Sequence, residues 1–242
     1  MSKMAKIVVA AVAVVIVLGA GLWYFVLRDT SPEVASLDAI DVPSNLGTAG
    51  SGGPAGTGAA EAPTSADGTW NVVAGDDVFV GYRIQELFGG QTIEKTATGR
   101  TPAVEGSIAI DGTTISSATF TADVTQLASD EARRDAAVGT RGLQTETFPE
   151  ATFTLTDPIT LPSAPAVGEE MTVSATGDLT LRGVTKPVTL ELTAQWTGSA
   201  VTIAGSAPIV LADFDMEVIE IPGFVTVADN GVLELQLVLQ PA

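Results

Sequence analysis

From Trp70 to the end of the chain, apolar and polar residues alternate in eight short segments. Successive side chains of a β-strand point to opposite faces, so a strand with one buried face shows this period of two. Eight such strands predict an all-β domain over residues 69–242, folded as an antiparallel up-and-down barrel. The apolar rows start at Val78, Val104, Ala118, Ala151, Val173, Leu190, Val201 and Leu233.

Turn and cap residues punctuate this pattern. Only Glu131–Val138 looks helical, because it lacks Gly and Pro and follows the N-cap candidates Ser129 and Asp130. We therefore predict a single short helix between strands. Tight hairpins are predicted at Asp111-Gly112, Arg182-Gly183 and Gly198-Ser199.

An unbroken apolar run, Ile7 through Leu27, precedes the domain. About 20 residues are needed to cross the hydrocarbon core of a bilayer as a helix. Lys3 and Lys6 before the run favour a cytoplasmic N-terminus. We predict a cytoplasmic segment at 1–6 and a transmembrane signal anchor at 7–27. The protein is then expected in the cell membrane, single-pass, with its C-terminal domain outside the cytoplasm.

A cleaved signal peptide is the alternative, which would leave a secreted protein. Gly19-Ala20-Gly21 offers a small-residue cleavage site. The apolar run continues through Leu22–Leu27, beyond the length of a signal h-region, and this favours the uncleaved anchor.

Residues 28–68 are rich in Pro, Gly, Ala, Ser and Thr and show no periodicity. Such a segment cannot bury an apolar face, so we predict a disordered linker. A Gly-rich coil of about 40 residues has a root-mean-square span of ~35 Å.

Composition excludes several classes of function. The chain has no His and no Cys, so neither a Ser-His-Asp nor a Cys-His nucleophile system can exist, and we predict no catalytic residues. Its net charge of −18 disfavours nucleic acid as a partner. The carboxylates do not follow an EF-hand spacing, and we predict neither a metal site nor a cofactor.

Two sequence blocks resemble a known family. One is the hairpin block Gly177–Leu192, with its Gly-Val-Thr-Lys-Pro-Val-Thr-Leu core, and the other joins Arg134-Asp135 to Phe148-Pro149-Glu150-Ala151-Thr152-Phe153. Together they are similar to the YceI-like family, over roughly Trp70 to Gln240. The resemblance implies a lipocalin-like barrel that holds a long polyisoprenoid chain.

The apolar side chains of such a barrel are either cavity walls or plain core packing. Glycines inside three strands, Gly106, Gly177 and Gly205, either permit bends or leave room for a ligand. Phe88-Gly89-Gly90 and Pro222-Gly223-Phe224 are candidate rim segments. The candidate cavity residues are Tyr82, Leu87, Phe88, Phe120, Phe148, Phe153, Leu179, Leu192, Trp196, Phe214 and Phe224.

The first strand departs from the family pattern. Many members carry histidines there, whereas Asp76–Glu86 keeps the apolar alternation without them. Other residues must then contact a ligand headgroup, and Arg83 and Arg134 are the candidates, with Tyr82 as a further one. Alternatively, Arg134 forms a salt bridge that ties the helix to the barrel.

The resemblance implies non-catalytic binding or transport of a polyisoprenoid lipid, an isoprenoid quinone or polyprenyl carrier, at the outer face of the membrane. The expected partners are this lipid and, through the N-terminal helix, the cell membrane. The alternative is a structural or interaction protein of the cell envelope with a filled barrel and a protein partner. A continuous apolar cavity of several hundred Å³ distinguishes the first from the second.

Overall fold

The computed structural model describes residues 31–41, 63–88, 93–221 and 225–242. The predicted span at 7–27 lies outside these ranges, as does most of the predicted linker. Within the described ranges, no helix combines the length and the apolar character needed to cross a bilayer.

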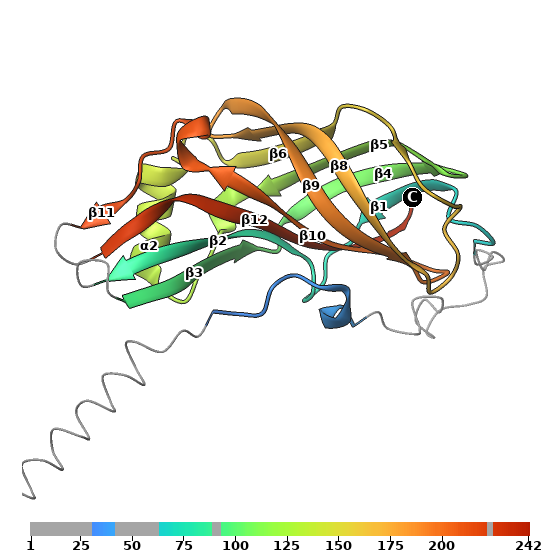
Figure 1. The fold of residues 1–242 in the computed structure, drawn as a ribbon, viewed down its shortest axis with the longest axis horizontal. Coiled ribbons are helices and arrows are strands. Elements are labelled where there is room, and N and C mark those ends of the chain that lie inside the picture. Colours follow the sequence, from blue (N-terminus) through green and yellow to red (C-terminus); the bar gives the residue numbers. More distant parts are fainter. Residues whose placement is uncertain (1–30, 42–62, 89–92, 222–224) are drawn as a thin grey trace, which may run out of the picture.

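The predicted all-β architecture is confirmed: the strands form one antiparallel sheet curved into a barrel (Figure 1). The eight predicted rows are strands β2, β4, β5, β6, β8, β9, β10 and β12, whereas β1, β3 and two very short strands were not predicted. The strands are β1 (Gly68–Val72), β2 (Phe79–Phe88), β3 (Ile93–Thr101), β4 (Val104–Asp111), β5 (Thr114–Asp123), β6 (Glu150–Leu155), β7 (Ile159–Thr160), β8 (Glu170–Leu181), β9 (Val184–Trp196), β10 (Val201–Val210), β11 (Glu220–Ile221) and β12 (Val225–Pro241).

The barrel closes through the long strand β12, which has two successive partners on one edge. Its first part pairs with β2, from Val225 opposite Phe88 to Gln236 opposite Phe79. Its last residues pair with β1, which also pairs with β4. The closed ring is therefore β1-β4-β5-β6-β8-β9-β10-β12, eight strands. At the other end β2 and β3 extend from β12, and the helix α2 lies at that end (Figure 1).

The three predicted hairpin turns are confirmed by their backbone conformations. Arg182 and Gly183 both have positive φ, 51° and 74°, as a two-residue type I′ turn between β8 and β9 requires. Gly112 and Gly198 also take positive φ, at the β4–β5 and β9–β10 connections.

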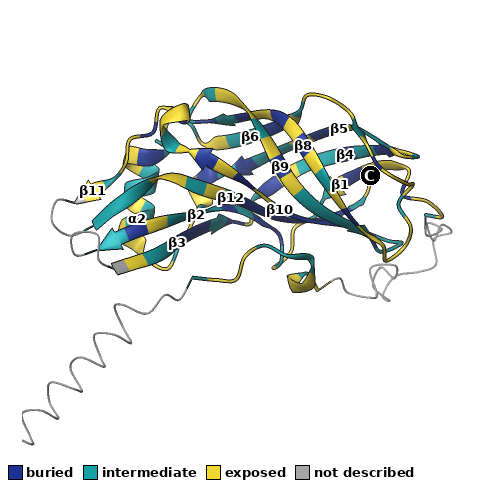
Figure 2. Ribbon diagram, viewed as in Figure 1, coloured by how far each residue is buried: buried dark blue, intermediate teal, exposed yellow. Residues whose placement is uncertain are grey.

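The end of the barrel remote from α2, which we call the closed end, is filled by side chains. Trp70, Leu237 and Leu239 are at most 1% exposed and belong to one apolar cluster. The indole Nε1 of Trp70 donates to the Ala66 carbonyl at 2.8 Å, so this large side chain is buried without an unpaired donor. Figure 2 shows the buried residues of β10 and β12 continuing along the barrel.

The one predicted helix is confirmed as α2 (Ala132–Ala137), which continues into a π-helical turn, η4 (Val138–Gly142). The predicted N-cap was wrong, because the cap is Glu131, whose side chain accepts from the Arg133 N–H at 3.1 Å. Ser129 is engaged elsewhere, since its hydroxyl donates to Asp135 at 2.6 Å.

Residues 31–41, which we call the strap, were predicted as part of the disordered linker but lie against the outer face of the barrel. The backbone N–H groups of Ala35 and Ser36 donate to Glu234 and Gln236 of β12 at 3.4 and 3.3 Å. A single 3₁₀ turn, η2 (Leu37–Ala39), follows, and Ile40 packs against the core cluster. Polar side chains on the outer face of β12 thus supply acceptors that composition alone does not reveal.

Candidate functional site

A cavity of about 710 Å³ lies at the α2 end of the barrel. This volume falls within the roughly 300–1,000 Å³ typical of ligand pockets. Strands β2 and β12 and the segment from α2 through η4 form much of its wall. Its apolar lining includes Val80, Ile84, Leu127, Val138, Leu143, Leu181, Ile209, Met216, Ile219 and Leu233.

The strand arrangement explains why the barrel is open at this end. The pairing of β12 with β2 shifts register between Val227 and Gly231, and such bulges bend a strand away from its partner. Beyond β2, strand β3 has no further strand alongside it in the described part of the chain, apart from the Arg100–Ala128 bridge. The segment that carries α2 covers this gap and completes the wall.

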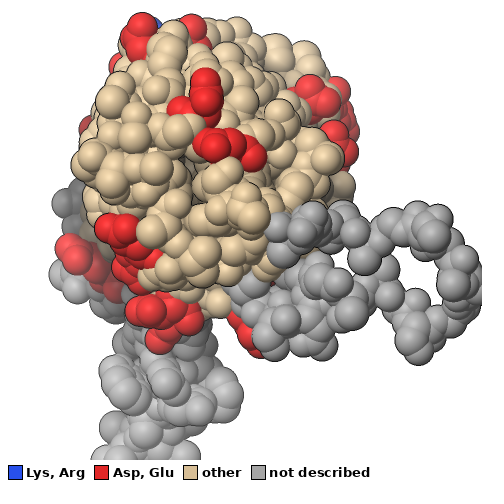
Figure 3. All heavy atoms as spheres, turned by 90° about the vertical axis from the view of Figure 1, so that its right-hand side faces the viewer, with Lys and Arg blue, Asp and Glu red and all other residues tan. Residues whose placement is uncertain are grey.

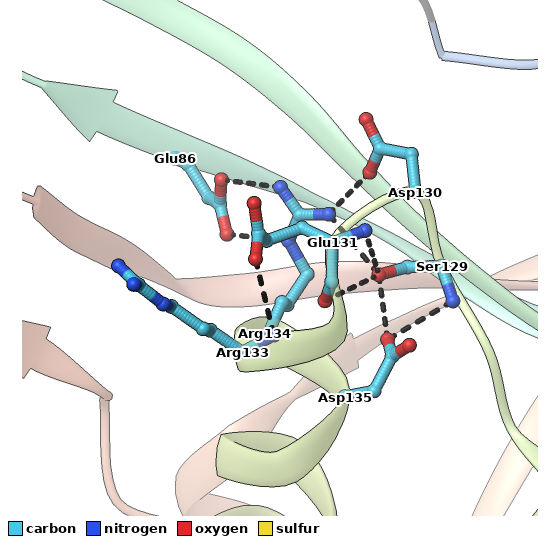
Figure 4. A network of polar contacts seen from close by, with 7 residues as sticks. All are labelled: Glu86, Ser129, Asp130, Glu131, Arg133, Arg134 and Asp135. Atoms are coloured by element: carbon cyan, nitrogen blue, oxygen red, sulfur yellow. Dashed lines mark hydrogen bonds and ion pairs between the residues drawn. The ribbon is translucent and has the colours of Figure 1, made fainter.

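Glu86 and Arg134 hold the helix to the sheet (Figure 4). Arg134 Nε donates to Glu86 Oε1 at 2.8 Å, and Nη2 donates to Oε2 at 2.9 Å. The third nitrogen, Nη1, donates to Ser129 and Asp130. The hydrogen bond with Glu86 raises the pKa of Arg134 above its usual value. With every guanidinium nitrogen engaged, Arg134 acts as a brace between α2 and β2, which agrees with the salt-bridge interpretation.

Tyr82 is one of the residues that line the same cavity. Its ring lies against Gly99, where an added Cβ would come within 2.5 Å of Tyr82 Cε1. Its hydroxyl is buried and has no hydrogen-bond partner among the described residues. Burial raises the pKa of this phenol, against the opposing effect of the Arg134 charge. Tyr82 is therefore a neutral phenol at pH 7, and its hydroxyl is closed off from the open space of the cavity.

Of the sequence-predicted residues, Tyr82, Phe88, Arg83 and Arg134 line this cavity. The Arg83 side chain, however, is engaged toward the strap, where its Nε donates to Glu234 at 2.9 Å and its Nη2 to the Pro32 carbonyl. Arg83 thus contributes to the wall without a free guanidinium.

Three of the predicted aromatic and aliphatic residues pack over the strand glycines. A Cβ at Gly106 would lie 2.6 Å from Phe120 Cδ1, and one at Gly177 would lie 2.4 Å from Phe153 Cζ. Leu192 lies over Gly205 in the same way, at 2.4 Å. These glycines make room for neighbouring side chains, so they contribute to dense packing in the barrel wall.

The remaining predicted residues are not part of the cavity lining. Leu179, Trp196 and Phe214 belong to the apolar core. Phe148 lies over Gly183 at the β8–β9 turn, 2.8 Å from where a Cβ would stand. Leu87 neighbours Phe88 on β2 and so points to the opposite face of the sheet. Phe224 and the tips of both candidate rim segments lie outside the described residues.

Sequence reasoning missed three cationic residues of the lining, Lys95, Arg133 and Arg141. Their shared charge was the available signal, because Lys and Arg are scarce in this chain. A smaller hollow of about 380 Å³ lies beside the strap, outside the barrel, with Glu33, Asp76, Asp77, Arg100 and Gln236 in its wall. In the described ranges, no three or more carboxylates are placed to hold a metal ion together.

Part of this chain is similar in sequence to known proteins. The family model of the YceI-like domain matches residues 71–239. Protein YceI of Escherichia coli O157:H7 is 34% identical over 151 residues, which cover 59% of this chain and 73% of that protein. The UPF0312 protein plu2095 of Photorhabdus laumondii is 32% identical over 154 residues, 60% of this chain and 73% of that protein.

A solved structure shows the same architecture. It is a polyisoprenoid-binding domain from Saccharophagus degradans implicated in plant cell wall breakdown, with a TM-score of 0.54 and 17% identity. The match covers 72% of this chain and 98% of that domain, and it shows a common fold. With the family model matching most of the chain, the conclusion is direct: this protein belongs to the YceI-like family.

Proposed function

We propose that this protein binds a polyisoprenoid lipid in its barrel, without catalysing a reaction, and carries or sequesters that lipid at the outer face of the cell membrane. The observation that carries the proposal is the cavity of about 710 Å³ at the α2 end. Its largely apolar wall suits an isoprenoid tail, and the structurally similar S. degradans domain is described as polyisoprenoid-binding.

Burial of the tail supplies the affinity. Each Å² of apolar surface removed from water contributes about 25 cal/mol, so a long tail needs no charged anchor to bind. The Tyr82 hydroxyl has no partner among the described residues, and a small displacement of the surrounding side chains would let it donate one hydrogen bond to an oxygen at the head of the lipid. Isoprenoid quinones and polyprenyl carriers both have such an oxygen.

The cavity also separates this proposal from the filled-barrel alternative. A purely structural barrel has a solid core throughout, as this one has around Trp70 at its closed end. A purely structural barrel would not need the cavity beneath α2, so the cavity favours ligand binding over the filled-barrel alternative. The N-terminal apolar run, Ile7–Leu27, supports a membrane location close to the source of the lipid.

Native mass spectrometry of the full chain, purified from its source membranes without added lipid, tests the proposal. We expect an adduct with the mass of an isoprenoid quinone or a polyprenyl lipid. The variant Leu233→Trp fills the cavity and should lose the adduct, whereas Val167→Trp, at a position 63% exposed and outside the cavity lining, should retain it. A clean apo mass, unchanged after incubation with both lipid types, would refute lipid binding.

A further inference from the structure

The outer face of the barrel beneath the strap carries a cluster of charged side chains. Glu234 is 2% exposed and accepts from Arg83 Nε at 2.9 Å and from Arg100 Nε at 2.8 Å. The Arg100 guanidinium also lies over the Phe79 ring, 3.9 Å from its centre. These residues come from β2, β3 and β12, so the cluster is built without any atom of the strap. We call it, together with Gln236, the strap site.

The strap site binds main-chain atoms of the strap. Its two arginines donate from Nη2 to the consecutive carbonyls of Pro32 and Glu33. Its carboxylate and its amide accept from the consecutive N–H groups of Ala35 and Ser36. The side chain of Val34, between these two pairs, is 63% exposed. Two donors and two acceptors on the barrel thus hold a stretch of backbone, and they would hold the strap of any copy of this protein equally well.

The chain that joins the strap to β1 is longer than this arrangement needs. The strap ends at Asp41, whose N–H donates to Asp77 at 3.0 Å, beside Gln236 of β12. Strand β1 begins past Pro241, at the end of the same strand. About seven strand residues separate the two places, a distance of ~23 Å. The 21 residues at 42–62 can extend to about 70 Å. Their length is sufficient for the strap to bind a neighbouring barrel as well as its own.

We propose that the strap site is an interface between two copies of this protein, in which the strap of each copy binds the barrel of the other. Exchange of an identical segment is a low-cost route to a dimer, because both sites stay filled and every contact is kept. A strap on a flexible linker meets its own site at an effective concentration of about millimolar, so exchange requires copies that are held close together. Anchoring in one membrane would do this, and the inference therefore rests on the membrane location proposed above, but not on the ligand.

The surface charge favours strap exchange over direct contact between two barrels. The net charge of the chain is −18, and Figure 3 shows Asp and Glu on the end of the barrel remote from α2, with Lys or Arg visible only at one edge. Two such surfaces repel each other at close approach. A connection of up to about 70 Å lets two copies exchange straps while their acidic surfaces stay apart.

Crosslinking between two cysteine variants tests the inference, because the natural chain has no Cys. Val34 of the strap and Asp76 of the barrel are exposed and line the same hollow of about 380 Å³. Full-length Val34→Cys and Asp76→Cys, carrying different tags, are reconstituted together in phosphatidylcholine vesicles and treated with a short bismaleimide. We expect a crosslinked heterodimer, which a synthetic peptide of residues 31–41 should suppress. Val167→Cys in place of Asp76→Cys, at an exposed position outside that hollow, should give only the background of random collisions.

The variant Glu234→Gln gives a readout that random collision would not change. On the copy that carries Asp76→Cys, it weakens the strap site and should remove most of the heterodimer. On the copy that carries Val34→Cys, it frees that copy's own strap and should increase the heterodimer. A heterodimer that responds equally to both placements, or that the peptide leaves unchanged, would overturn the inference.

A single chain carrying both Val34→Cys and Asp76→Cys completes the experiment. If it crosslinks internally while the mixture gives no heterodimer above background, each strap binds only its own barrel and the inference is wrong. If neither sample crosslinks, the strap does not occupy the site at all, which also overturns it. A protein that fails to float with the vesicles would refute the membrane location and the exchange together. Lipid binding is tested separately by the adduct measurement, so its failure and that of strap exchange are distinguishable.

Discussion

Glu86 of β2 and Arg134 of α2 are joined by two parallel hydrogen bonds of 2.8 and 2.9 Å, and their side chains are only 9% and 17% exposed. This bidentate pair fixes one wall of the cavity to the other. Asp130 also contacts Arg134, but its side chain is 70% exposed, so water screens that contact.

Removal of the Glu86 charge should therefore loosen the helix. Breaking a shielded ion pair by changing one partner typically costs about 3 kcal/mol, because the other charge remains buried and unpaired. We expect Glu86→Gln to lower the free energy of unfolding by about that amount, measured by urea denaturation. Asp130→Asn, the matched change on the exposed side of the same arginine, should cost less than about 1 kcal/mol. Equal losses for the two variants would contradict this assignment.

Substitution of a closely packed glycine should destabilise the protein more than substitution of a glycine with free space around it. Gly177→Ala would place a methyl group 2.4 Å from Phe153 and 2.5 Å from the Thr154 carbonyl, and overpacking of this kind costs about 1–3 kcal/mol. At Gly75 the nearest atom is 3.8 Å away, so Gly75→Ala should be nearly neutral. Thermal unfolding of both variants checks this. An unchanged midpoint for Gly177→Ala would show that the site tolerates a larger side chain.

The strap depends on Glu234, which is 2% exposed and accepts from Arg83 at 2.9 Å and Arg100 at 2.8 Å. Glu234→Gln should weaken both ion pairs, cost about 2–4 kcal/mol and release the strap. Amide hydrogen exchange at Ala35, whose N–H bonds to this carboxylate, should then accelerate. Glu105→Gln, at an exposed position on β4, is the control. Continued protection of Ala35 in Glu234→Gln would mean that the strap is held by other contacts.

Tyr82 predicts a dependence of stability on alkaline pH. Burial holds its pKa above the value of about 10 expected for an unfolded chain, so above that pH the unfolded state loses a proton that the folded state retains. Stability should fall as pH rises beyond about 10, and Tyr82→Phe should reduce that fall without weakening the protein at pH 7.

The chain has one other tyrosine, Tyr24, so tyrosinate absorbance of a Tyr24→Phe variant reports Tyr82 alone. Titration of Tyr82 with an ordinary midpoint would show that its hydroxyl is accessible to water.

Strands with one buried face could be predicted from the sequence, because burial of one face makes apolar and polar residues alternate along the strand. That covers the eight main rows and their turns. Strand β3 was not predicted because its segment Glu94-Lys95-Thr96-Ala97-Thr98 has almost no apolar residues and so shows no alternation. It lies at a sheet edge beside a cavity, where large inward side chains are not required.

The location of the cavity could not be predicted for a different reason. Alternation shows which residues of a strand point inward, as for Phe153 and Tyr82, but not at which end of the barrel the space is filled. That depends on β12 pairing with β1 over one part and β2 over another, a contact between residues far apart in sequence. The strap was missed similarly, because its acceptors lie on β12.

The strap also changes what the N-terminal segment can do. Residues 42–62 join the strap to β1, so they connect two places on the same barrel and add nothing to its reach from the membrane. With the span at 7–27 that we propose, only residues 28–30 separate the bilayer from Ser31, which itself lines the cavity. Four peptide units extend at most about 14 Å. A barrel that binds lipid as we propose would then collect it from its own membrane at close quarters, and delivery to a distant acceptor would require the strap to detach first.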